Sequence, residues 1–457
     1  MKSHLPNIYC VNIKISGNTR LSCSCQRFSG YFRLFLMKKF LFSGIIACLI
    51  GFCLSCTTTE DSAGLQMRAG LPNFNYKIQK NEPVSVVFLG GSITNHQGYR
   101  VQITDWLKQQ YSNVQFTSIN SGIGGTGSDL GVFRTERDVL QYHPDLVFVE
   151  FAVNDAKTDS LVIAHSMEGI VRKIWHHNPH TDICFLYTLN EPMLDDLKAG
   201  KNYRSVRYME TVADYYDIPS VNFADDVLEL LNEDKLVFKG DSKKEYSGKI
   251  VFTNDGTHPT YDGGHPIYTK TLSRSLLQMN KAQEKAHALK APLYPGNYEK
   301  AKMIPVTELE HSEGWKLLSK DDKAFSNFQG DQKALPVVLE SSDSEDFVKV
   351  HFKGIRVGVF DLIGPSSGGM TVEIDQNDPS YIRRFDKYCG DRNRTNYCLF
   401  ESLNEEEHTI IIRPDNRRFE KAEIYKMNPK RIKETEYFNE FNTYLGYILL
   451  VGDIIQN

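Results

Sequence analysis

The sequence lacks the features that mark nucleic-acid-binding and zinc-binding proteins. Its 53 Lys and Arg residues are slightly outnumbered by 57 Asp and Glu, which gives a net charge of −4 and no basic excess. A nucleic-acid partner is therefore not expected. Cysteine is scarce beyond residue 56, where only Cys184, Cys389 and Cys398 occur, and none of these belongs to a C-x-x-C pair. The sequence therefore gives no indication of a zinc site.

Internal repeats and long low-complexity tracts are also absent. The chain has 457 residues, which is too many for one average domain, and 41 % of them are hydrophobic, enough to build packed cores. We therefore expect two globular domains with additional segments.

The N-terminal part has the pattern of an export signal. From Met37, the stretch "MKKFLFSGIIACLIGFCLSC" places lysines before a short apolar run that ends at Cys56. The run is too short and wrongly flanked for a membrane-spanning helix, but it is typical of a secretory signal. Its ending, Leu54-Ser55-Cys56, resembles the lipobox of bacterial lipoproteins, which implies cleavage before Cys56 and a lipid on its sulfur. A plain signal peptide with a chance cysteine is the alternative.

This pattern divides the first 80 residues into three segments. Residues 1–36 lie upstream of a normal start and are attributed to a start codon assigned too early, 37–55 form the signal peptide, and 56–80 form a tether. Several acyl chains on Cys56 would anchor the protein stably. We therefore expect a membrane partner and an exported protein anchored to the cell envelope, on the periplasmic or outer face of an outer membrane.

Export would also permit a disulfide bond. Cys389 and Cys398 are close in sequence, and an oxidising compartment allows them to pair. Two free thiols are the alternative.

Residues 81–285 alternate between strand-like and helix-like segments. The strand-like runs are short and almost entirely apolar, and they cover 84–90, 114–120, 145–153, 182–189 and 219–224. Helix-like stretches such as 99–111 and 160–178 lie between them. This alternation predicts an α/β domain with a parallel sheet covered by helices on both faces. Ligands of such sheets bind at the carboxyl ends of the strands.

The second half of the chain has a different texture. A linker-like stretch, "APLYPGNY", is followed over 295–430 by strand-like runs separated by turn residues, with little helical pattern. This predicts a β-sandwich accessory domain. The remaining segment, 431–457, is unusually apolar for a terminus, and it is interpreted as a tail that forms either an interface or a packing strand.

Polar motifs follow several predicted strands of the first domain. Gly90-Gly91-Ser92 comes after the first strand, where glycines permit a tight turn and the serine opens the next helix. The glycine-rich stretch 120–128 follows the second strand and is suited to present a backbone N–H to an oxyanion. Asn154 follows the third strand, and its amide is a neutral donor for a developing negative charge.

The last motif, "NDGTHPTYDGGHP" over 254–266, combines acids and histidines. His258 could take a proton from Ser92 while Asp255 orients the ring. Asp262 and His265 have the same spacing, so spacing alone does not choose between the pairs.

Each motif also has a simpler explanation. A serine after glycines occurs in ordinary turns, and an asparagine is common as a helix cap. The stretch 122–127 fits G-x-G-x-x-G, the dinucleotide fingerprint. It follows the second strand, however, and no suitably placed acidic residue ends the next one. An oxyanion turn is therefore preferred to a nicotinamide site.

Taken together, these motifs resemble the SGNH (GDSL-type) hydrolase family over roughly 84–280. The resemblance implies a flavodoxin-like sheet, Ser92 as nucleophile, and oxyanion donors from Ser92, Gly125 (or Gly124) and Asn154. It also favours Asp255 and His258 as the remaining catalytic residues, since the family writes D-x-x-H-P before its last helix. Gly91 departs from the Gly-Asp-Ser that is common in the family.

The resemblance implies a serine esterase that works through an acyl-enzyme, with neither cofactor nor metal. An envelope location and a β-sandwich module favour acetyl esters on a glycan as substrate, with Tyr99, Trp106 and Tyr261 as candidate sugar-stacking side chains. A lipase or general carboxylesterase is one alternative, although no lid insertion is apparent and only 189–202 could shape a pocket wall. A non-catalytic glycan-binding lipoprotein is another, and the β module could be either a sugar binder or a structural cap.

Overall fold

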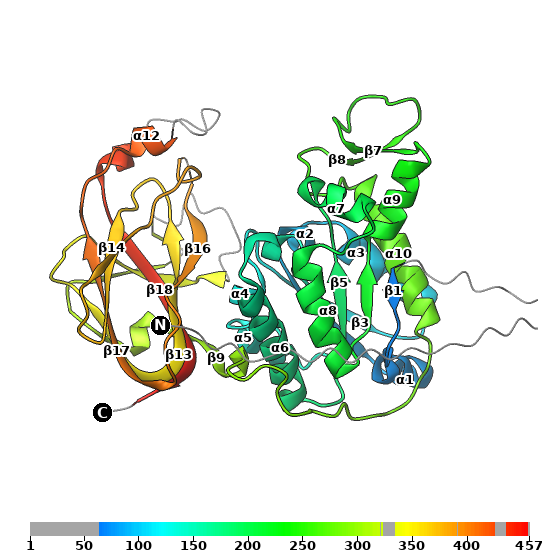
Figure 1. The fold of residues 1–457 in the computed structure, drawn as a ribbon, viewed down its shortest axis with the longest axis horizontal. Coiled ribbons are helices and arrows are strands. Elements are labelled where there is room, and N and C mark those ends of the chain that lie inside the picture. The colour runs from blue at the N-terminus through cyan, green and yellow to red at the C-terminus, as the bar shows by residue number, and fades with distance from the viewer. Residues whose placement is uncertain (1–63, 320, 323–333, 391, 426–435, 456–457) are drawn as a thin grey trace, which may run out of the picture. The chain divides into compact units, whose positions relative to one another are not determined.

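The computed structural model describes residues 64–319, 321–322, 334–390, 392–425 and 436–455. The expected start region, signal peptide and Cys56 therefore lie outside the described residues. Figure 1 shows two successive domains, the first coloured from blue to green and the second from yellow to red.

The first domain is built on a six-stranded sheet. Its strand order is β1-β6-β5-β4-β2-β3, and all neighbours are parallel except the β1–β6 pair. The strands are β1 (Leu65–Gln66), β2 (Val84–Gly90), β3 (Phe116–Gly122), β4 (Leu146–Glu150), β5 (Asp182–Tyr187) and β6 (Ser220–Asn222). The five parallel strands have the flavodoxin-like order, so the expected fold class is confirmed.

Helices cover both faces of this sheet because alternate strand residues point to opposite sides. Val87 of β2 packs toward α6 (Ser160–His177) and α8 (Arg204–Tyr216), whereas Phe88 packs toward the other layer. That other layer consists of α1 (Pro72–Lys80), α3 (Tyr99–Gln110), α9 (Ala224–Asn232) and α10 (Gly264–Gln278). Residues 64–80 thus form β1 and α1, and the prediction of a tether extending to residue 80 was wrong for this part.

The second domain consists mainly of β-strands, as expected, with the short helix α12 (Lys421–Tyr425). Its strands are β9 (Ala301–Pro305), β10 (Glu310–His311), β11 (Lys316–Ser319), β12 (Val337–Ser341), β13 (Val348–Ile363), β14 (Gly369–Ile374), β15 (Ser380–Arg383), β16 (Arg394–Leu399), β17 (Glu406–Asp415) and β18 (Thr443–Ile454). They form one ten-stranded antiparallel sheet, and not the two separate sheets of the expected sandwich. The reason is the long central strand β13, which pairs with β17 along its first half and with β16 along its second half and so keeps both groups of strands in one sheet.

The apolar C-terminal segment is an integral strand of this sheet. β18 pairs with β13 over most of its length and also with β9 and β12. Leu445, Ile448 and Leu449 are fully buried there. The domain boundary predicted at residue 430 was therefore wrong, because the last strand completes the core.

The two domains share contacts. Arg137 of the first domain donates to the Ala334 carbonyl at 2.7 Å, and Tyr397 Oη donates to Asp129 Oδ1 at 2.8 Å. The apolar cluster around α6 also includes residues of the β domain such as Leu335 and Phe360. The β domain therefore packs on the face of the sheet that α6 covers.

The cysteines of the second domain are free thiols. Cys389 packs in a small cluster with Phe385 and Tyr425, whereas Cys398 packs against the main core of the domain. The predicted Cys389–Cys398 disulfide was therefore wrong, because the two thiols belong to separate clusters.

Candidate active site

Ser92 lies at the carboxyl end of β2, at the start of the short helix α2 (Ser92–Asn95). Gly91 occupies the residue before the helix, and the first helical backbone bonds run from Asn95 N to the Gly91 carbonyl and from His96 N to the Ser92 carbonyl. The N–H of Ser92 therefore has no partner within the helix and is available as a donor.

Ser92, His258 and Asp255 form a continuous chain of hydrogen bonds. The distance from Ser92 Oγ to His258 Nε2 is 2.8 Å, and that from His258 Nδ1 to Asp255 Oδ2 is 2.7 Å. A carboxylate accepts only, so it places the ring proton on Nδ1 and leaves Nε2 to accept the Ser92 hydroxyl proton. This is the geometry required of a nucleophile, its base and the group that orients the base.

Asp255 is held in its ionised form. Partial burial by itself would raise the pKa of its carboxyl group, but hydrogen bonds from the His258 ring and from the backbone N–H groups of His258 and Thr257 outweigh this effect. The pKa of Asp255 is therefore held well below its usual range. Thr253 Oγ1 donates a further hydrogen bond to Asp255 Oδ1 at 3.0 Å.

The alternative pair, Asp262 and His265, does not contact Ser92. His265 is 2 % exposed at the start of α10, and its Nδ1 accepts the backbone N–H of Tyr99 at 3.1 Å. Burial lowers the pKa of His265 to about 4, so the ring is a neutral core histidine at physiological pH. Of the two histidines, His258 is therefore the one that lies within hydrogen-bonding distance of Ser92.

The predicted oxyanion donors lie around Ser92. A Cβ atom at Gly124 would stand 3.7 Å from the Cβ of Ser92, and Gly125 has a φ of +76° with open space beside its Cα. The Asn154 carboxamide lies against Gly91, directly before the nucleophile. The glycine turn and the asparagine therefore both approach the serine, as their positions after β3 and β4 predict.

Sequence reasoning missed a buried carboxylate beneath the nucleophile. Glu150, the last residue of β4, is fully buried and accepts hydrogen bonds from Thr94 Oγ1 at 2.8 Å and Thr188 Oγ1 at 2.6 Å. Burial raises the pKa of its carboxyl group, while these bonds and one from the Gly91 N–H act in the opposite direction. The glutamate in the middle of the apolar run "DLVFVEFAV" was the available signal.

Two further buried carboxyl groups, those of Asp155 and Asp129, form a pair next to Asn154. Asp155 is fully buried, and its Oδ1 accepts the Ser128 N–H at 3.0 Å. Burial and the neighbouring Asp129 raise the pKa of Asp155 to about 8. Tyr397 of the β domain donates to Asp129, so this pair lies where the two domains meet.

A cavity of about 350 Å³ opens beside the catalytic histidine. Its lining combines polar groups with a larger share of apolar surface, and it includes His96, whose ring lies 4.8 Å from that of His258, and the 55 % exposed Tyr261. The other two aromatic candidates for sugar stacking differ. Tyr99 is fully buried, and Trp106 is partly buried and packs against Tyr111 beside the core.

Two segments lie beside the site. Only the first of them, 189–202, was expected from the sequence as a possible pocket wall. The segment 189–202 contacts the catalytic loop, because Glu191 N donates to the Gly256 carbonyl at 2.7 Å. The strands β7 (Leu236–Lys239) and β8 (Ile250–Thr253) form a separate small parallel sheet. Figure 1 shows this sheet at the same end of the domain as α2.

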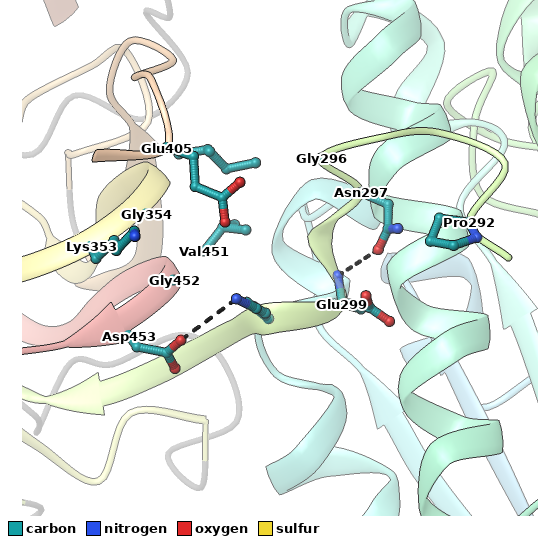
Figure 2. A pocket seen from close by; sticks show the side chains of 12 residues that line it. Pro292, Gly296, Asn297, Glu299, Lys353, Gly354, Glu405, Val451, Gly452 and Asp453 are labelled. Carbon is teal, nitrogen blue, oxygen red and sulfur yellow. Dashed lines mark hydrogen bonds and ion pairs between the residues drawn. The ribbon is translucent and has the colours of Figure 1, made fainter. Parts of the chain in front are cut away.

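A different cavity, of about 340 Å³, lies between the connecting segment and the β domain. Figure 2 shows its charged lining, in which Lys300 pairs with Asp453 and Asn297 accepts the Glu299 N–H. This cavity has no serine, cysteine or histidine in its lining, so it is not a candidate for the same chemistry.

Two further properties concern the described ranges. Within them, no three or more His, Cys, Asp or Glu side chains are grouped to hold a metal ion. No helix of the described residues has the length and apolar character needed to cross a membrane.

Comparison with protein families matches residues 88–264 to the GDSL-like lipase/acylhydrolase family. This range contains Ser92, Asn154, Asp255 and His258. Residues 88–264 form a GDSL-like hydrolase domain. The resemblance found in the sequence is therefore confirmed for this domain.

The GDSL-like domain and the β domain together have a known structural counterpart. The crystal structure of a two-domain esterase (CEX) active on acetylated mannans, co-crystallised with mannopentaose, is similar with a TM-score of 0.62 and 19 % identity, over 86 % of this chain and 100 % of that one. Axe2, an acetylxylan esterase from Geobacillus stearothermophilus, has a TM-score of 0.33 and 20 % identity, over 42 % of this chain and 94 % of its own. Comparison with curated protein sequences gave no match.

Proposed function

We propose that the protein is a serine esterase that removes acetyl groups from a glycan. The observation that carries the proposal is the hydrogen-bonded chain Ser92–His258–Asp255 at the carboxyl edge of the parallel sheet. It provides a nucleophile, a base and an orienting carboxylate in one place.

The reaction follows from this geometry. Ser92 Oγ attacks the ester carbonyl and passes its proton to His258 Nε2, while Asp255 stabilises the imidazolium. The N–H groups of Ser92 and Gly125 and the Asn154 amide stabilise the oxyanion. His258 then gives the proton to the leaving sugar oxygen. Water, activated by His258, attacks the acyl-enzyme and releases the acid.

The character of the site supports a short acyl group on a polar scaffold. The cavity beside His258 is open and only about 350 Å³ in volume, with polar side chains of His96, Gln97 and Asn254 in its lining, whereas a long acyl chain would need a longer enclosed groove. The two-domain fold shared with an esterase active on acetylated mannans supports a glycan as that scaffold. A lipase would instead prefer long-chain esters.

The proposal is tested by acetate release from acetylated glycans and from model esters of increasing acyl length. Wild type should release acetate and prefer the shortest acyl group, and Ser92→Ala should abolish the activity. Asp262→Asn, at the alternative acid, is the matched control and should remain active. Preference for long acyl chains would favour a lipase, and glycan binding without Ser92-dependent hydrolysis would overturn the enzyme proposal.

We further propose that a lipid on Cys56 anchors the protein to the cell envelope, outside the cytoplasm. The support is the lipobox-like Leu54-Ser55-Cys56 after the apolar run from Met37. Cys56→Ala should move the protein from the detergent phase to the aqueous phase of a phase-partition experiment. Cys53→Ala, in the same run, is the control and should leave it in the detergent phase. Equal partition of the two variants would contradict the proposal.

A further inference from the structure

Two neighbouring cavities meet at Asn254, the residue before the catalytic acid. The first, of about 350 Å³, holds His96, Gln97 and Tyr261 beside His258. The second, of about 410 Å³, is lined by residues 240–243 and again by Asn254. The two cavities adjoin at Asn254, and we refer to them together as the depression, with His258 and Tyr261 in one part and the 240–243 loop in the other.

The 240–243 loop, which forms the far wall of this depression, is held in place by two hydrogen bonds. Ser242 N donates to Asn254 Oδ1 at 2.8 Å, and Gly240 N donates to the Thr253 carbonyl at 3.0 Å. The loop that joins β7 to β8 is thereby attached to the strand that leads into Asp255. Asn254 therefore links the wall of the second cavity to the catalytic loop.

Tyr261 presents an exposed ring at the near end. It is 55 % exposed, and its ring makes no aromatic or cation contact with the described residues. Its backbone is nevertheless fixed, because its carbonyl accepts from Gln102 Nε2 at 3.1 Å and the preceding Thr260 Oγ1 donates to the Val251 carbonyl at 2.7 Å. An exposed aromatic face on a fixed backbone is a platform on which the apolar face of a sugar ring can pack.

We propose that this depression is an extended glycan-binding groove, in which Tyr261 stacks on one sugar residue and the Asn254–Ser242 wall receives another. The acetylated sugar lies between them, at Ser92. The substrate class is therefore an acetylated oligosaccharide or polysaccharide rather than an acetylated monosaccharide. This inference rests on the proposed function and specifies its substrate.

The test compares kcat/KM for an acetylated monosaccharide, acetylated oligosaccharides of increasing length and p-nitrophenyl acetate, using the full-length chain. Wild type should prefer oligosaccharides to the monosaccharide. In Tyr261→Ala, the ratio of kcat/KM on oligosaccharide to that on p-nitrophenyl acetate should fall about tenfold, mainly through KM, which corresponds to about 1.4 kcal/mol. Tyr261→Trp should keep the ratio.

Two further variants make the result specific. Ser242→Trp, which fills the second cavity, should lower the same ratio. Tyr142→Ala is the matched control, because Tyr142 is also an exposed tyrosine (44 %) but precedes β4, at the other end of the strands. It should change neither activity nor the ratio.

The outcomes separate this inference from the proposed function. No Ser92-dependent acetate release from any substrate overturns both. Hydrolysis of monosaccharide and oligosaccharides at equal efficiency, with the ratio unchanged in Tyr261→Ala and Ser242→Trp, overturns the groove and leaves the esterase standing.

Discussion

The carboxamide of Asn154 lies directly against Gly91: a Cβ atom at residue 91 would stand 2.1 Å from Asn154 Oδ1. Gly91 has a φ of −91°, outside the left-handed region, and the lack of space for a side chain is what favours glycine at this position. The residue that departs from the common Gly-Asp-Ser pattern is therefore the one that makes room for the Asn154 amide, our proposed oxyanion donor.

Gly91→Ala should displace the Asn154 amide and lower kcat by about 10²–10³-fold, the usual effect of losing one oxyanion donor. Gly91→Asp should do at least as much harm, even though it restores the more common residue. Kinetics on a short-chain model ester would measure both.

The control for this prediction is a double-mutant cycle. If Gly91→Ala acts by moving the amide, the double variant with Asn154→Ala should be no slower than Asn154→Ala alone. Additive losses, or full activity in Gly91→Ala, would contradict the explanation. Circular dichroism would establish that each variant is folded.

Asp255→Asn should lower kcat by about 10³–10⁴-fold, because an amide that donates to His258 Nδ1 favours the wrong tautomer of the ring. Asp262→Asn should have little effect, since Asp262 is exposed and His265 Nδ1 accepts the Tyr99 N–H. Since the pKa of Asp255 lies well below its usual range, a loss of activity in mild acid does not come from its protonation. Equal losses in the two variants would contradict the assignment.

The cysteines offer a test that is independent of catalysis. Burial raises the pKa of the Cys389 thiol to about 12 and raises that of Cys398 as well, so neither should react quickly with an alkylating reagent in the folded protein. After denaturation without a reductant, mass spectrometry should find both residues alkylated. A mass lower by two hydrogens and two missing labels would reveal a disulfide and contradict the structure.

Local patterns predicted the core of the fold well and its edges poorly. The apolar runs that became β2, β4 and β5 are buried on both faces, so composition alone identifies them. β18 was not recognised as part of the sheet because its partner β13 lies far earlier in the chain and nothing local indicates that pairing. The short strands β7 and β8 were missed, since four residues carry too little pattern.

The candidate site was predictable to the extent that each residue follows a strand. Ser92 and Asn154 were placed at the correct edge by that rule alone. The choice of His258 over His265 needed the resemblance to a family, because only tertiary packing buries the second histidine. Glu150 and Asp155 could not be assigned a role from the sequence, since burial is what gives an ordinary acid an unusual environment.

Asp155→Asn should reduce the pH dependence of stability. Burial, and then the neighbouring charges of Asp129 and Glu150, raise the pKa of Asp155 to about 8, so the folded protein holds a proton that the unfolded chain releases. Stability therefore falls as pH rises from about 4 to about 8, by at most about 1.4 kcal/mol per pH unit for this one proton. Asparagine imitates the neutral acid and still accepts the Ser128 N–H through Oδ1.

The measurement is the melting temperature of wild type and variant across this pH range. The two curves should nearly coincide near the acid end, and the variant should become the more stable protein as the pH approaches about 8, where Asp155 in wild type loses its proton. Glu150, Asp129 and Tyr397 remain in both proteins, so the comparison reports the Asp155 proton together with its coupling to these neighbours. Asp262→Asn, at an exposed carboxylate, should follow wild type throughout. Parallel curves for Asp155→Asn and wild type would mean that Asp155 is ionised in the folded protein. In that case, the pair formed by Asp155 and Asp129 does not hold a proton.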